Sequence, residues 1–405
     1  MYIKDVIVWG TECTLDVMLK LEESQFNDML SIFMGQGING KYKVLFERLS
    51  EKGLKRDEEV KGIDQEILMD LIRNSYEIIK EGSNQRRESI GDSPCISAYT
   101  SRTLADGHPS FPDIHYVGSL PSTVQSYVQI VGNGHQEFFA HSIKNDHCPL
   151  TFSIEVGRYK LMLANSKGRN LDELDREQYI KSISELMNDY QGNRVIAFGG
   201  LNKGSPSDYH KLFSHIRKNV SNVKLFLGTN SFSSQDEQRI KEVYGLLETA
   251  DIISFNDAEL TDVSRAVLNN GGESLSERLR NTLPSKFKIC HSAEGAIMSL
   301  NDEGKQMNGD CDFNKILQIC SDAASYCYWS GHKPTHIEAI IYSDSVKQRQ
   351  EERFHNAFVS PNSGLPKGML RSIAPDIKDA RGTLTGIGAT FDGYLMSCLL
   401  SKNLF

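Results

Sequence analysis

A glycine-rich stretch near the end of the chain, GTLTGIGATFDG (residues 382–393), has the composition of an anion-binding loop. Gly386 and Gly388 flank Ile387 at an expected junction between a loop and a helix, where free backbone N–H groups collect. An acid or base could do chemistry at the start of that helix, but the residue there is Ala389. Asp392 follows three residues later, nearly one helical turn on, and we expect it to face another direction. The stretch therefore predicts an anion site without a titratable group at Ala389.

Two further polar motifs follow apolar runs. DIISFNDAEL places Asn256 at the end of an expected strand and Glu259 at the start of a helix. An amide and a carboxylate at this spacing could orient a hydrated Mg²⁺, which prefers oxygen ligands. The competing explanation is a capping box closed by Glu259, which is a purely structural device. FKICHSAEGAIMSL ends a strand at His291, which is either a structural residue or a ligand-binding one, and turns through Gly295.

The elements that must position these motifs form a regular alternation. Near-continuous apolar runs alternate with amphipathic helical patterns, which is typical of a parallel sheet covered by helices on both faces. Because ligands bind such sheets at the carboxyl ends of the strands, we expect the motifs at the strand ends to share one site. The clearest expected strands are residues 6–10, 114–118, 194–200, 223–228, 251–256 and 287–292.

A second kind of pattern occupies residues 119–163. Apolar and polar residues alternate there, with turn signals at GNG and at VGRY. This alternation predicts antiparallel, half-exposed sheet. We expect a small β-rich domain that lies against the α/β core, with a cleft between the two.

Composition excludes several classes of function. The formal net charge of −8 argues against a nucleic-acid partner, and the one dense basic run, KQRQEER (residues 347–353), is interleaved with acids and is typical of a solvated helix face. The 8 cysteines show no CxxC spacing, which indicates reduced thiols rather than disulfides or a metal cluster. No apolar run is long enough to span a membrane. We therefore expect a soluble, cytoplasmic protein that binds small molecules.

Taken in order, the motifs resemble the ribokinase-like superfamily, and within it the ADP-dependent glucokinase and phosphofructokinase family. The resemblance covers nearly the whole chain and rests on GTECTLD, SIGDSPCISAY, HYVGSLP, LTFSIEVGRYKLMLANSKGRN, DIISFNDAEL, KICHSAEGAI and TLTGIGATFDG. It implies a doubly wound, mostly parallel sheet with a small β-rich lid. The large domain would comprise residues 1–13, 93–118 and 173–405, and the lid residues 14–35, 84–92 and 119–172.

The resemblance also implies an activity. It predicts Mg²⁺-dependent transfer of a phosphoryl group from ADP or ATP to a hydroxyl of a sugar, sugar phosphate or nucleoside. Asp92, where the family has glycine, favours a neutral acceptor because a carboxylate repels phosphate. The implied site residues are Asp16, Gly91 and Asp92 for the acceptor, His291, Gly295, Lys167, Arg169 and Asn230 for the nucleotide, Asn256 and Glu259 for the metal, and Gly386, Ile387, Gly388 and Ala389 at the catalytic loop.

Two departures from the family pattern leave alternatives open. The family has at position 389 an Asp that accepts the proton of the substrate hydroxyl, and Ala389 cannot do this. Ala389 is then either a substitution made to trap a complex, which the otherwise intact motifs favour, or the native residue of a pseudokinase that binds nucleotide and regulates. Lys224-Leu225-Phe226 replaces an HxE motif near the metal, so the choice of donor stays open. A third possibility is an unrelated α/β domain that carries the motifs by chance.

Overall fold

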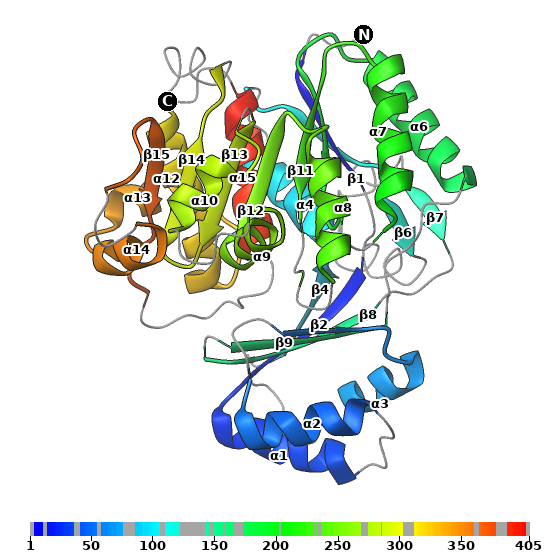
Figure 1. Cartoon of the computed structure of the whole chain (residues 1–405), viewed down its shortest axis with the longest axis vertical. Helices are drawn as coiled ribbons and strands as arrows, with labels where there is room; N and C mark the ends of the chain where they lie inside the picture. Colours follow the sequence, from blue (N-terminus) through cyan, green and yellow to red (C-terminus); the bar gives the residue numbers. More distant parts are fainter. Residues whose placement is uncertain are drawn as a thin grey trace.

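The computed structural model describes most of the chain. The described residues are 4–10, 14–35, 41–54, 58–75, 86–91, 93–105, 110–121, 142–145, 150–157, 159–165, 173–201, 204–229, 232, 236–268, 274–284, 286–302, 312–359, 364–377 and 387–401. They form a large α/β body and, beneath it in Figure 1, a smaller body built on a second sheet.

The large body is built on an eight-stranded sheet. Six neighbouring strands run parallel, and the sheet then continues through an antiparallel pair at one edge. All six strands expected from the sequence are present. In sheet order the strands are β5 (Asp113–Tyr116), β1 (Val6–Gly10), β10 (Arg194–Phe198), β11 (Val223–Gly228), β12 (Ile252–Asn256), β13 (Phe287–Ser292), β14 (Gly295–Ser299) and β15 (Met369–Ile373).

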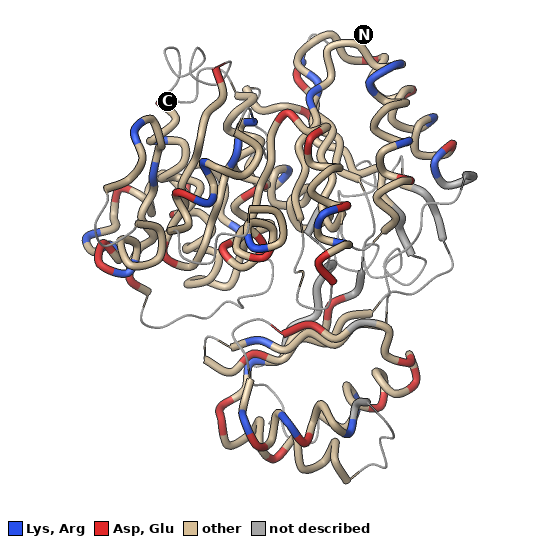
Figure 2. Tube along the Cα trace, in the orientation of Figure 1, with Lys and Arg blue, Asp and Glu red and all other residues tan. Residues whose placement is uncertain are grey.

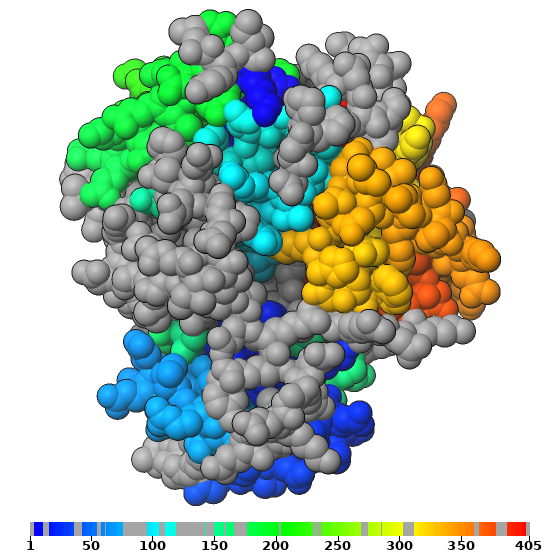
Figure 3. Space-filling view, turned by 180° about the vertical axis from the view of Figure 1, so that it is seen from behind, coloured from blue at the N-terminus to red at the C-terminus, as the bar shows by residue number. Residues whose placement is uncertain are grey.

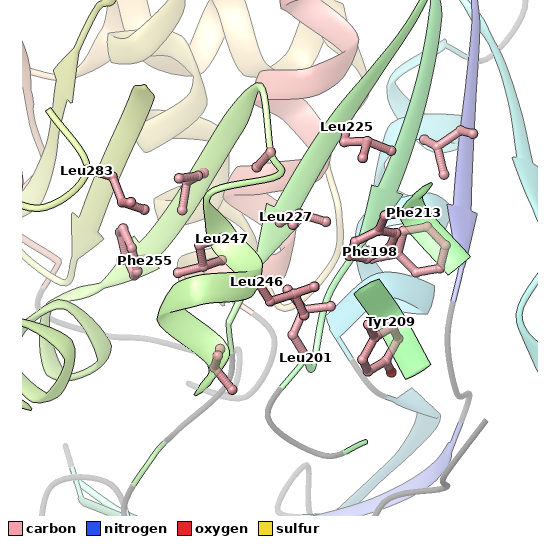
Figure 4. Close-up of a cluster of buried hydrophobic side chains, with 14 of the residues drawn as sticks. Phe198, Leu201, Tyr209, Phe213, Leu225, Leu227, Leu246, Leu247, Phe255 and Leu283 are labelled. Carbon is pink, nitrogen blue, oxygen red and sulfur yellow. The ribbon is translucent and has the colours of Figure 1, made fainter. Parts of the chain in front are cut away.

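Helices cover both faces of this sheet, and successive side chains of one strand enter opposite cores because strand side chains alternate. In β1, Val6 and Val8 belong to one buried cluster and Ile7 and Trp9 to the other. Figure 4 shows part of the first cluster, between the sheet and its covering helices. The first face is covered by α6 (Glu173–Asn188), α7 (Pro206–Asn219), α8 (Glu237–Leu247), α9 (Asp257–Leu268), α10 (Leu275–Asn281) and α14 (Glu351–Phe358).

The second face carries the helix that begins at the glycine-rich stretch. Figure 3 views the molecule from behind and shows α4 in cyan beside α12 and α13 in yellow to orange. The helices of this face are α4 (Ser93–Ala105), α12 (Phe313–Ser330), α13 (His336–Ser345) and α15 (Ile387–Leu400). The fold is therefore α/β and doubly wound, as expected from the sequence.

The smaller body has a five-stranded sheet and a buried core of its own. Three helices, α1 (Glu23–Gly35), α2 (Lys41–Lys52) and α3 (Gln65–Ser75), cover one face. Residues 36–83 carry no element that was expected from the sequence, and in the structure they contain α2, α3 and one strand of this sheet. The strands are, in sheet order, β3 (Glu58–Lys61), β9 (Tyr159–Ala164), β8 (Leu150–Val156), β2 (Thr14–Leu21) and β4 (Arg86–Gly91).

The expectation of antiparallel, half-exposed sheet over residues 119–163 is only partly confirmed. The hairpin of β8 and β9 is antiparallel and turns within VGRY, but β8 pairs with β2 in parallel and β9 pairs with β3 in parallel. The polar residues of β8 are buried too, since Ser153 is 0% and Glu155 1% exposed. The alternation of polar and apolar residues in β8 therefore separates two buried faces of the strand, and neither of them is exposed. A separate parallel pair joins β6 (Ser119–Pro121) and β7 (Ile143–Asn145), and the expected GNG turn lies outside the described residues.

Charges of both signs are interspersed over the two bodies, as Figure 2 shows. In the parts of the chain that the structure describes, no helix combines the length and hydrophobicity that a membrane crossing requires.

Candidate active site

A cavity of about 250 Å³ lies at the carboxyl ends of the central parallel strands. Its lining comes from the ends of β10, β11, β12 and β13, from the first turns of α15, and from β9 of the small sheet. This edge is where open parallel sheets bind ligands, because strand-to-helix loops and helix N-termini converge there. The three expected motifs meet in it, since Asn256, His291 and Gly388 all line the cavity.

Asn256 and Glu259 form a reciprocal capping box at the start of α9. Glu259 N donates to Asn256 Oδ1 at 2.8 Å, and Asn256 N donates to Glu259 Oε2 at 2.9 Å. Thr229 Oγ1, at the end of β11, also donates to Glu259 Oε2 at 2.8 Å. The structural explanation offered for this motif is therefore present. The same box holds an amide and a carboxylate at the wall of the cavity.

His291 lies at the end of β13 with its side chain only 15% exposed. Its ring packs against Phe391 with centroids 5.1 Å apart. Burial lowers the pKa of His291 to about 4, so the imidazole is neutral at physiological pH. A neutral ring can act on a ligand through a hydrogen bond but not through charge.

The first turn of α15 lies directly against this imidazole. A Cβ atom at Gly388 would lie 2.6 Å from His291 Cε1, so no larger residue fits without a shift of the ring or helix. Ala389 follows, buried and lining the cavity, and its carbonyl accepts a hydrogen bond from Ser97 Oγ of α4 at 2.8 Å. Ile387 also lines the cavity, whereas Gly386 lies outside the described residues.

Asp392 lines the same cavity, so the expectation that it faces another direction is wrong. Residues three apart on a helix lie on neighbouring positions of one face. Asp392 therefore lies on the same side of α15 as Ala389, nearly one turn closer to the C-terminal end of the helix. Ser254 Oγ, on β12, donates to Asp392 Oδ1 at 2.6 Å, and His291 Nε2 is 3.9 Å from the same oxygen. Burial raises the pKa of Asp392 to about 7, against a smaller lowering by the Ser254 hydrogen bond.

Lys160 also lines the cavity, although its sequence context does not predict this. It lies on β9, opposite Glu155 in the hairpin, and its side chain reaches the cavity from the small sheet. A cation at this position can attract an anionic ligand. Nothing in the local sequence identifies Lys160, because its position depends on how the small sheet faces the large one.

The expected acceptor residues lie on the small sheet. Asp16 is on β2, 4% exposed, and is paired with Thr151 on β8 and Ser89 on β4; it does not line the cavity. Gly91 ends β4 opposite Thr14. Asp92 lies outside the described residues.

Gly295 occupies the turn between β13 and β14 with φ of +143°, where a Cβ would lie 2.2 Å from the Ser372 carbonyl oxygen. Close backbone packing thus accounts for glycine at this position, and it does not line the cavity. The other expected nucleotide residues, Lys167, Arg169 and Asn230, lie outside the described residues.

A protein-bound metal would need several ligands close together. Within the described ranges, no group of three or more His, Cys, Asp and Glu side chains could hold a metal ion.

No protein-family model and no curated protein sequence matches the chain. Solved structures match in fold. An ADP-dependent kinase in complex with fructose-6-phosphate and ADPβS has a TM-score of 0.67 at 11% identity, covering 98% of this chain and 94% of that one. A phosphofructokinase from Pyrococcus horikoshii OT3 with AMP has a TM-score of 0.62 at 11% identity, covering 98% of both chains.

A last common ancestor of ADP-dependent phosphofructokinases from Methanosarcinales is similar to the same degree, with a TM-score of 0.62 at 11% identity over 98% of this chain and 94% of that one. The fold of this chain is therefore ribokinase-like.

Proposed function

We propose that the chain is a kinase that transfers the terminal phosphoryl group of ADP or ATP to a hydroxyl of a sugar, sugar phosphate or nucleoside. The observation that carries the proposal is the meeting of Asn256, His291 and Gly388 at one cavity on the carboxyl edge of a ribokinase-like sheet. Enzymes catalyse phosphoryl transfer mainly by positioning the donor and the acceptor and by stabilising the negative charge on the transferred group. Helix N-termini and cations that meet at one cavity can do both.

In this proposal the start of α15 binds the transferred phosphoryl group. The amides of Gly386, Ile387 and Gly388 would form the anion hole, and Lys160 would face it from β9. Neutral His291 would donate or accept a single hydrogen bond at the nucleotide. Further donor contacts are assigned by the family resemblance to Gly295, Lys167, Arg169 and Asn230.

The small body would act as the lid. We assign it residues 14–35, 84–92 and 119–172 as proposed bounds, together with the helices that cover its sheet. Asp16, Gly91 and Asp92 would hold the acceptor hydroxyl groups. Closure of this body over the cavity would exclude water, which otherwise competes with the acceptor for the phosphoryl group.

Mg²⁺ fits the wall formed by Asn256 and Glu259. Both residues already use an oxygen in the capping box, so they would hold the hydrated ion through its waters, while the donor phosphates supply the inner ligands. When bound, the ion neutralises charge on the phosphates. Thr229 keeps the Glu259 carboxylate in place through its 2.8 Å hydrogen bond.

ADP is the donor that the fold favours, because the similar structures are ADP-dependent kinases. The chain departs from that group at β11, where Phe226 lines the cavity instead of a charged residue. ATP therefore belongs in every assay beside ADP.

Calorimetry with ADP and ATP, with and without Mg²⁺, tests the proposal directly. We expect binding that Mg²⁺ strengthens, and we expect Gly388→Ala to weaken it by about tenfold or more, because the new methyl displaces His291 or α15. Gly245→Ala is the matched control, since a Cβ at Gly245 on α8 meets nothing within 4 Å. Failure of the unmodified chain to bind either nucleotide with Mg²⁺ would refute the proposal.

Ala389 supports a second candidate, a pseudokinase that binds nucleotide and regulates a partner. The methyl group of this buried residue lines the cavity and cannot accept a proton. Turnover separates the two candidates: release of AMP from ADP, or of ADP from ATP, in the presence of a panel of sugars and nucleosides supports the kinase. Tight nucleotide binding without turnover on any acceptor supports the regulator.

A further inference from the structure

Three carboxylates line the cavity within the described ranges, and two of them serve the start of α9. Glu259 closes the capping box, and Asp257 Oδ1 accepts a hydrogen bond from the next backbone N–H. Asp392 is different. Its Oδ1 accepts from Ser254 Oγ, while Oδ2 accepts no hydrogen bond from any part of the chain that the structure describes. Asp392 therefore brings an available acceptor oxygen to the cavity.

We infer that Asp392 is the general base of the phosphoryl transfer, one helical turn further along α15 than Ala389. The inference rests on the proposed function and assigns a residue within it. Three residues of helix advance the side chain by about 4.5 Å along the axis and leave it on a neighbouring position of the same face. The carboxylate is thus shifted along α15 and still lines the cavity.

One hydrogen bond holds the carboxyl group in place. Ser254 Oγ fixes Oδ1 at 2.6 Å, and the His291 ring lies 3.9 Å from the same oxygen, so the second oxygen remains for the acceptor. Oδ2 lies beside Gly228 at the end of β11, where the absence of a side chain leaves space. Ala389 contributes to the same opening, because a longer side chain there would occupy the cavity beside Asp392.

The chemical step is ordinary phosphoryl transfer. The acceptor hydroxyl oxygen forms a bond to the terminal phosphorus as its proton passes to Asp392 Oδ2. The bond from that phosphorus to the bridging oxygen breaks, and its electron pair leaves with AMP when ADP is the donor or with ADP when ATP is the donor. The proton is later released from Asp392 to solvent.

The protonation state of Asp392 suits this role. Burial raises the pKa of Asp392 to about 7, and a general base works best when its pKa lies near the operating pH. A carboxylate with an ordinary pKa would be ionised but would be a weaker base. The other titratable side chains that line the cavity or act on Asp392 are Lys160, Asp257, Glu259, His291 and Cys320.

The experiment compares the unmodified chain with Asp392→Asn, Ala389→Asp and the control Asp344→Asn, which changes an exposed residue of α13. Calorimetry with ADP and ATP in the presence of Mg²⁺ comes first, and turnover on the acceptor panel follows. We expect Asp392→Asn to keep nucleotide affinity and to lose about 10²- to 10⁴-fold in kcat. We expect the control Asp344→Asn to turn over at the rate of the unmodified chain. We expect Ala389→Asp to bring no gain in turnover, because Asp392 already supplies the base.

A pH profile separates a base from a residue that only supports the structure. We expect the kcat of the unmodified chain to fall below about pH 7, and carbon NMR of the labelled Asp carboxyl groups to show one that titrates there and is missing in Asp392→Asn. Nucleotide binding with turnover that survives in Asp392→Asn would overturn the assignment and leave the kinase proposal standing. Turnover that appears only with Ala389→Asp would also overturn it. Absence of nucleotide binding in calorimetry refutes the kinase proposal, and the assignment falls with it.

Discussion

His291 and Asp392 show how burial suppresses charge of either sign. Burial lowers the pKa of His291 to about 4 and raises the pKa of Asp392 to about 7, because an ion loses hydration in both cases. Between about pH 4 and pH 7 both side chains are therefore neutral: the Asp392 carboxyl group is protonated and the His291 imidazole is not. An ion pair between them is not expected, although the two groups are only 3.9 Å apart.

The raised pKa of Asp392 predicts a pH-dependent stability. Between its ordinary value of 3.8 and about 7, the folded chain holds a proton that the unfolded chain releases. The free energy of unfolding therefore falls as the pH rises through this window, by at most roughly 4 kcal/mol. We expect Asp392→Asn to be about as stable as the unmodified chain near pH 4 and more stable at pH 8, as measured by urea denaturation.

His291 contributes with the opposite sign, since its folded pKa lies below the ordinary 6.5 and stability is lost as the pH falls from 6.5 to about 4. The unmodified chain and Asp392→Asn both contain His291, so the contribution of His291 cancels when their free energies of unfolding are compared at the same pH. Equal stability of the two at pH 8 would contradict the prediction.

At the residue level, the sequence predicted what depends on local spacing. Asn256 and Glu259 are three residues apart, and that spacing led to both the capping box and the expected place at a strand end. Asp392 and Lys160 were misjudged or missed because their roles depend on tertiary placement: on the rotation of α15 against β12, and on the approach of the small sheet.

At the level of elements, α15 is fixed against α4 by two serine hydroxyls. Ser97 Oγ donates to the Ala389 carbonyl, and Ser101 Oγ donates to the Gly393 carbonyl, both at 2.8 Å. Gly393 lets the two helices approach so closely that a Cβ there would lie 2.4 Å from the Ser97 carbonyl oxygen. The position of α15 along α4 therefore depends on these contacts, and the position of Asp392 depends on it in turn.

Gly393→Ala should force these helices apart. We expect a loss of about 1–3 kcal/mol in the free energy of unfolding, measured in urea, because the added methyl meets backbone that cannot yield locally. Gly245→Ala, in open space on α8, is the control and should be neutral or slightly stabilising. Equal behaviour of the two variants would show that the α4–α15 contact is looser than described.

The strands of the large sheet were predictable because burial on both faces makes them almost continuously apolar. The small sheet was harder. Ser153 and Glu155 alternate with Phe152 and Ile154, and this pattern predicts one exposed face when both are in fact covered. The parallel pairing of β8 with β2 has no local signal, since more than a hundred residues separate the strands.

At the level of the whole molecule, the two bodies meet at the cavity. Lys160 reaches it from β9, and Lys20 on β2 lies 5.8 Å from the ring centre of Tyr328 on α12. The small body thus contributes directly to the proposed nucleotide site. A change in its position would alter both the charge and the access of that site.

Lys160→Ala should weaken the binding of ADP by about tenfold at low ionic strength, because a charge-assisted contact to phosphate is lost. The loss should shrink as salt is added, since salt screens an accessible charge. Lys52→Ala, at the exposed end of α2, serves as the control in the same calorimetric titrations. An affinity that Lys160→Ala leaves unaltered at low salt would exclude a phosphate contact from the small sheet.

The strand order β3-β9-β8-β2-β4 has a consequence for synthesis on the ribosome. The nascent chain delivers β2, β3 and β4 early, but the middle strand β8 and its neighbour β9 emerge only with residues 150–164. Until then α1, α2 and α3 have an incomplete apolar surface to cover. The amino-terminal quarter of the protein is therefore expected to stay open to chaperones for several seconds of translation.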